Sequence, residues 1–92
     1  MINTMKIEMK KFGAILNSRP DGREAALRLF QIVNGTNEKK IVIDFNGVVV
    51  LTPSFADEFL TLINDRYIGS KEIEIINANT PVVKSTLQVL AK

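Results

Sequence analysis

Two adjoining segments decide the fold of this chain: IVIDFNGVVVL, residues 41–51, and TPSFADEF, residues 52–59. The first begins with a run of β-branched residues, which is typical of a central strand covered on both faces. From the second segment onward, apolar residues recur at helical spacing, so that Phe55, Phe59, Leu62 and Ile63 share one face. Phe59 lies at the centre of this face, and we expect it to be buried. A strand that leads into a helix is the basic unit of an α/β fold.

The junction between this strand and this helix has two interpretations. Asn46 and Gly47 stand between two apolar runs, which is a strong signal for a tight hairpin. Alternatively, they form a turn at the end of the strand, and residues 48–51 connect it to the helix. Two residues are candidates for the N-cap of the helix. The cap is either Thr52, with proline as the first helical residue, or Ser54, which would form a capping box with the acidic residue three positions on.

The chain upstream of this unit starts with a strand pattern and continues with a helix pattern. Apolar and charged residues alternate over residues 5–10, which predicts an edge strand. Residues 14–16 are short and apolar. They form either a packed loop or, as we favour, a second strand that folds back on the first as a hairpin. Helical spacing follows over residues 23–33, with Ser18 or Asp21 as the cap and an asparagine–glycine pair at the end.

Downstream, charged and apolar residues alternate again over residues 72–75, which predicts another strand. Residues 77–81 then cap a last helix, whose apolar positions are Val83, Leu87 and Leu90. We expect the strands at 41–45 and 73–76 to be adjacent and parallel, joined by a helix that begins within residues 52–55. The whole chain, residues 1–92, is expected to be a single α/β domain with a mixed, mostly parallel sheet of about four strands and three helices.

The composition removes most catalytic and metal-binding chemistry. The 92 residues include no cysteine and no histidine, which excludes disulfides, thiolate metal sites and the usual base of a serine nucleophile. The sequence also lacks a glycine-rich phosphate loop. We therefore expect no enzyme, no catalytic residue, no cofactor and no metal site.

Charge and hydropathy limit the kinds of partner. The net charge is only +2, and the basic pairs at residues 10–11 and 39–40 are typical of a solvated surface, so no nucleic acid is expected. The longest apolar run, residues 48–51, is far too short to span a membrane, and the N-terminus does not form a signal-peptide core. We expect a cytoplasmic protein that does not bind a membrane.

Two polar loops, residues 52–54 and 77–80, follow the expected parallel strands. Because sites in open α/β sheets form at the carboxyl ends of the strands, we expect these loops to lie side by side. A serine at a helix start is a natural place for a bound or covalent phosphate, since free N–H groups and the helix dipole both favour negative charge. The alternative is that the hydroxyl and amide side chains of these loops only cap helices.

Four runs of residues occur in the order found in a known family: LNSR (16–19) followed by Gly22, DFNGV (44–48), SFADE (54–58) and NAN (77–79). Together they resemble the bacterial STAS-like domain family. The likeness covers most of the chain, and the SFADE run is fairly specific. In such folds the stretch after the strand is a connector into the helix, so the resemblance favours the connector over the hairpin.

More distantly, the chain resembles the STAS domains of anti-sigma-factor antagonists, in which the matching strand leads into an Asp-Ser-Ser-Gly turn. The second serine of that turn is phosphorylated in those domains by a partner kinase that is also the anti-sigma factor. That serine falls on Ser54 of this chain, whereas Thr52, Pro53 and Phe55 replace the other three residues of the turn.

The resemblance implies a non-catalytic regulatory module that docks a protein partner, such as a GHKL-type ATPase or kinase or another signalling protein. Ser54 is the candidate phosphorylation site. The candidate partner-binding residues are Arg19, Thr52, Ser54, Asp57, Asn77, Asn79 and Thr80. Two alternatives stay open: a plain scaffold or dimerisation domain in which Ser54 is only a cap, and a small domain that binds an anion or a nucleotide at the helix start.

Overall fold

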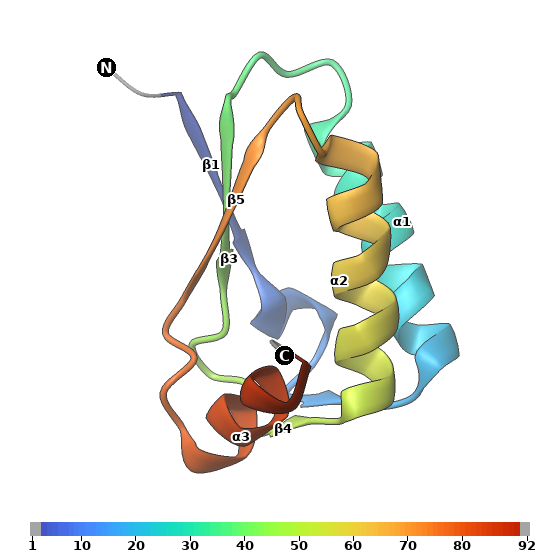
Figure 1. Ribbon diagram of the computed structural model, residues 1–92, viewed down its shortest axis with the longest axis vertical. Coiled ribbons are helices and arrows are strands. Elements are labelled where there is room, and N and C mark those ends of the chain that lie inside the picture. Colours follow the sequence, from blue (N-terminus) through green and yellow to red (C-terminus); the bar gives the residue numbers. More distant parts are fainter. Residues whose placement is uncertain (1–2, 91–92) are drawn as a thin grey trace.

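The computed structural model describes residues 3–90, and the side chains of residues 3–89. Figure 1 shows the arrangement of the helices and strands of this part of the chain. In chain order they are β1 (Thr4–Glu8), the short 3-10 helix η1 (Met9–Phe12), β2 (Ile15–Leu16), α1 (Arg19–Val33), β3 (Lys40–Asp44), β4 (Val50–Leu51), α2 (Pro53–Tyr67), β5 (Glu72–Ile76) and α3 (Pro81–Leu90).

The strands form two parallel sheets. In the larger sheet β3 lies in the centre, in the order β1-β3-β5, and β2 and β4 form the smaller sheet. Ile41 of β3 pairs with Met5 on one side and with Ile73 on the other, so the predicted parallel pairing of the strands at 41–45 and 73–76 is confirmed. The α/β fold with a mostly parallel sheet is confirmed as well, with three plus two strands where about four were expected.

The hairpin that we favoured for the first two strands is wrong. β2 is a strand, but it pairs in parallel with β4, Ile15 with Val50 and Leu16 with Leu51. The reason is the turn of 3-10 helix that follows β1, after which Gly13 adopts a φ of 132° and redirects the chain away from the edge of β1. The edge position of β1 itself is confirmed.

The connector interpretation of the segment after β3 is confirmed. Asn46 and Gly47 form a turn in which the backbone N–H of Val48 donates to the carbonyl of Phe45 at 3.1 Å. The chain then runs through β4 into α2, which begins at Pro53. Because β4 pairs with β2 and not with β3, the asparagine–glycine pair does not close a hairpin.

The two long helices, α1 and α2, cover only one face of the larger sheet (Figure 1). Ile41 and Ile43 of β3 are fully buried, whereas Val42 between them is partly exposed. Lys40 of β3 is the register partner of Glu72 in β5, and its ammonium group forms ion pairs with Glu72 and Glu74. These side chains lie on the face of the sheet opposite the helices. The expectation of a central strand covered on both faces is therefore wrong. A β-branched residue also suits a half-exposed sheet face, so its presence does not reveal how many faces are covered.

The core lies between this sheet and the two long helices. Phe59 is buried as predicted, with 1% of its surface exposed. Its ring stacks on that of Phe55 with a centroid distance of 5.9 Å. Leu29 of α1 and Ile63 of α2 are fully buried in the same cluster. The core thus fixes α1 and α2 against each other, and this packing positions the candidate site.

Candidate functional site

The starts of α1 and α2 lie at the same end of the molecule (Figure 1) and are joined by one hydroxyl group. Thr52 is the N-cap of α2, because its Oγ1 accepts a hydrogen bond from the N–H of Phe55 at 3.3 Å. The same Oγ1 accepts from the N–H of Ser18, the N-cap of α1, also at 3.3 Å. Of the two capping interpretations, Thr52 is therefore correct, and the interpretation of Ser54 as the cap is wrong.

A close backbone contact holds the two helix starts together. Gly22, in the first turns of α1, packs so tightly on α2 that a Cβ atom at this position would lie 2.5 Å from the carbonyl oxygen of Phe55. Glycine is needed here for space. From the sequence, Gly22 is assigned to a turn before the helix. Its contact with α2 could not be predicted, because its packing partner is more than thirty positions away.

Ser54 is the second residue of α2 and is exposed to solvent. In the part of the chain that the structure describes, the Ser54 hydroxyl takes part in no hydrogen bond. The hydroxyl that caps the helix is that of Thr52. Asp57 and Glu58 follow three and four positions later, and this spacing places them on the same side of the helix as Ser54. Ser54 is thus a surface hydroxyl beside two carboxylates at a helix N-terminus.

Arginines of α1 neutralise these carboxylates. Arg19 Nη1 lies 2.8 Å from Asp57 Oδ2 and 3.3 Å from Glu58 Oε1, and Arg23 Nε lies 3.2 Å from Glu58 Oε2. The hydrogen bonds to Asp57 and then to Glu58 raise the pKa of the Arg19 guanidinium above its ordinary value. The arginines and Asp57 are about half exposed, so the pairs stabilise the fold little. Their effect is to link α1 to α2 across the surface around Ser54.

The loop at residues 77–80 belongs to a different set of contacts. Asn77 has a φ of 56° and donates from Nδ2 to Asp44 Oδ1 at 2.9 Å. Thr80 Oγ1 accepts from the N–H of Val83 in the first turn of α3, and Asn79 is exposed. Within residues 3–89, no hydrogen bond or ion pair connects this loop to the residues around Ser54.

Asp44 is a buried carboxylate at the carboxyl end of β3, with only 4% of its side chain exposed. It accepts from the backbone N–H of Asn46 at 2.9 Å, in addition to the bond from Asn77, and it forms an ion pair of 3.2 Å with Lys6. The bond from Asn77 is the largest cause that lowers the pKa of Asp44, followed by the bond from the Asn46 backbone. Asp44 thus links the end of β3 to Lys6 in the middle of β1 and to Asn77 directly after β5.

The structure therefore brings together four of the predicted residues and leaves three apart. Arg19, Thr52, Ser54 and Asp57 meet at the helix starts. Asn77, Asn79 and Thr80 lie in the separate loop before α3. Sequence reasoning missed the bridging roles of Arg23 and Glu58, because no local pattern tells which face of α1 meets α2.

Within the described residues, no group of three or more acidic side chains is arranged to hold a metal ion. No helix in residues 3–90 is long and apolar enough to cross a membrane. The chemistry present at the helix starts is that of a surface hydroxyl, paired charges and backbone N–H groups.

Comparison with known proteins adds one finding. A family model described as a STAS-like domain of unknown function (DUF4325) matches residues 25–83, which include most of α1 and all of β3, α2 and β5. No curated protein and no solved structure gives a significant match. The matched segment contains Thr52, Ser54 and Asp57, whereas Arg19 lies before it.

Proposed function

The chain belongs to the STAS-like domain family, and on that premise we propose that it is a non-catalytic regulatory module that binds a partner protein through the joined starts of α1 and α2. In this proposal Ser54 is the residue that controls binding. The partner is a signalling protein, in the first place a GHKL-type ATPase or kinase that can also modify Ser54.

The observation that carries the proposal is the position of the Ser54 hydroxyl. It is exposed at the second position of α2, and the capping bond is made by Thr52 instead. A hydroxyl without a structural task at a helix N-terminus is accessible to a partner. It is also placed where the first-turn N–H groups favour a phosphate.

The surrounding charges explain how modification would act. A phosphoryl group adds about −1.5 to −2 charge and three acceptor oxygens. Asp57 and Glu58 repel this charge. In the proposal, Arg19, which contacts both of them, exchanges one carboxylate for the phosphate. These contributions oppose each other, so we expect the stability of the fold to change little. The changed surface charge is then felt mainly by the docked partner.

Two variants of Ser54 test this proposal. Tagged protein with Ser54→Asp or Ser54→Ala is used to capture partners from the native host, and the Kd is then measured with the purified partner. We expect Ser54→Asp to weaken binding by about tenfold or more and Ser54→Ala to bind like wild type, with both melting temperatures within a few degrees of wild type. Ser70→Asp adds the same charge beyond the opposite end of α2 and serves as the control.

If Ser54→Asp binds every partner as tightly as wild type does, Ser54 does not control binding. If Ser70→Asp weakens binding as much as Ser54→Asp, the effect comes from net charge and not from the helix start. Either result removes the proposed role of Ser54.

A further inference from the structure

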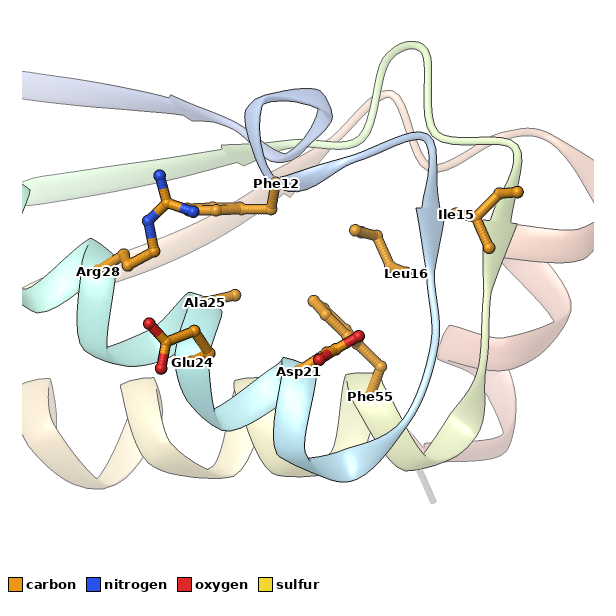
Figure 2. A pocket seen from close by; sticks show the side chains of 8 residues that line it. All are labelled: Phe12, Ile15, Leu16, Asp21, Glu24, Ala25, Arg28 and Phe55. Carbon is orange, nitrogen blue, oxygen red and sulfur yellow. The ribbon is translucent and has the colours of Figure 1, made fainter.

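An open pocket lies between β2 and the first half of α1 (Figure 2). Its apolar lining includes the buried side chains of Leu16, Ala25 and Phe55. The volume is about 230 Å³, below the range of about 300–1,000 Å³ that is typical of small-molecule sites. The pocket therefore suits a single side chain of a partner better than a whole small ligand.

The pocket has an acidic side. Asp21 and Glu24 of α1 line it, and Figure 2 shows both carboxylates on the helix side of the opening. In the part of the chain that the structure describes, neither forms an ion pair, whereas Asp57 and Glu58 nearby are both paired. Arg28 also lines the pocket, but its guanidinium stacks over the ring of Phe12 at 5.5 Å. Arg28 keeps its positive charge there, so two carboxylates against one guanidinium leave the pocket lining with a net negative charge.

The backbone of β2 offers unpaired groups beside this pocket. The carbonyl of Ala14 accepts from Val50 at 3.1 Å, and the carbonyl of Leu16 accepts from Thr52 at 3.0 Å. Successive residues of a strand direct their N–H and C=O groups to opposite edges, so those of Ile15 point away from β4. Among the described residues, 3–90, the smaller sheet has two strands, and β2 is open there to a further strand along this edge.

We propose that the pocket and the free edge of β2 bind an extended segment of a partner protein that carries a lysine or an arginine. The segment pairs with the backbone of Ile15, and the aliphatic stem of its basic side chain packs on Leu16 and Phe55. The charged end then reaches Asp21 and Glu24. This inference rests on the proposed function in that it assumes a protein partner. Apart from the buried ring of Phe55, it uses none of the side chains around Ser54.

A capped pentapeptide of the sequence threonine-valine-lysine-valine-threonine tests the inference by NMR titration of the full chain. Matched peptides carry norleucine or glutamate in place of the lysine. We expect the lysine peptide to shift the amide signals of Ile15, Leu16 and Ala25, and to bind about fivefold or more tightly than either matched peptide. We also expect its affinity to fall as salt is added.

The double variant Asp21→Asn/Glu24→Gln should weaken binding of the lysine peptide about fivefold, while Asp65→Asn, an exposed carboxylate of α2, should leave it unchanged. Signal changes confined to β1 or β5, equal binding of the three peptides, or no binding at millimolar concentration would overturn the inference. Titration of the Ser54→Asp variant separates the two proposals. If the Ser54→Asp variant binds the lysine peptide as wild type does, the pocket is a site of its own, whatever the outcome of partner capture. If the variant loses peptide binding, the pocket is not a separate site and the inference is overturned.

Discussion

At Gly22, the close packing of α1 on α2 requires glycine, although helix propensity favours alanine. In an exposed helix, replacing glycine by alanine stabilises by about 1 kcal/mol. Here the new Cβ would lie 2.5 Å from the backbone oxygen of Phe55, and neither backbone can yield as a flexible side chain would. Overpacking of this kind costs about 1–3 kcal/mol. We therefore expect the clash to outweigh the helix preference, so that Gly22→Ala lowers the free energy of unfolding in urea by up to about 2 kcal/mol. Gln31→Ala, on the exposed side of α1, should change it by less than about 0.5 kcal/mol. A stabilised Gly22→Ala variant would mean that the helices do not touch here.

Thr52 and Ser54 differ in what their hydroxyls do. The Thr52 hydroxyl caps α2 and also accepts from the Ser18 amide, so Thr52→Ala should cost about 1–2 kcal/mol in thermal or urea unfolding. Ser54→Ala removes no capping bond and should stay within about 0.5 kcal/mol of wild type. Thr52→Ser keeps the hydroxyl and should recover most of the loss. Equal effects of the two alanine variants would contradict the assignment of the cap.

Asp44 makes stability depend on pH. The pKa of this carboxyl is lowered in the folded state, chiefly by the bond from Asn77, so its contribution is present above the unfolded value of about 3.9. The contribution is lost as the pH falls through that value toward the lower folded pKa. We expect Asp44→Asn to be less stable than wild type at neutral pH and to lose less stability on acidification. Melting curves between neutral and acidic pH measure this. An unchanged slope for Asp44→Asn would refute the role of the buried carboxylate.

At the scale of elements, α2 depends on one buried aromatic ring. Phe59 is 1% exposed and stacks on Phe55, so Phe59→Ala removes a packed ring from the centre of the core. The cost should be about 3–5 kcal/mol. A small domain has only about 5–15 kcal/mol to lose, so the melting temperature should fall sharply. Thr61→Ala, an exposed position of the same helix, provides the comparison. A wild-type melting curve for Phe59→Ala would show that this face of α2 does not carry the core.

Elements with a long local pattern could be predicted from the sequence, and those defined by a distant partner could not. The run at residues 41–45 and the helical spacing after Pro53 identify β3 and α2, and the resemblance to a known family correctly chose the connector between them. β2 has two residues and pairs with a segment 35 positions away, so its pattern contains no information about its partner. The candidate site divides in the same way. The polar residues at the start of α2 are visible in the sequence, whereas the arginine bridges depend on how α1 packs on α2.

At the scale of the whole molecule, the larger sheet is protected unevenly. β3 is hydrogen-bonded on both sides and is mostly buried. Within residues 3–90, β5 pairs with β3 alone, and none of the residues of β5 is fully buried. Native-state hydrogen exchange should therefore be slowest at the amides of β3 and faster at those of β5. The measurement is a residue-resolved exchange series by NMR. If β5 exchanges as slowly as β3, something covers β5 in solution that the monomer lacks.

The pairing of strands also has a consequence for how the chain reaches this structure. Every pair in both sheets is parallel and joins residues 32 to 36 positions apart, such as Thr4 with Lys40 and Lys40 with Glu72. With no hairpin among these pairs, a sheet cannot start from a short local loop, and each contact between strands waits for a long loop to close. Such non-local topologies fold slowly for their size. During synthesis, β1 has no partner strand until residues 40–44 have left the ribosome. The central strand, β3, gains its second partner only after β5 has followed.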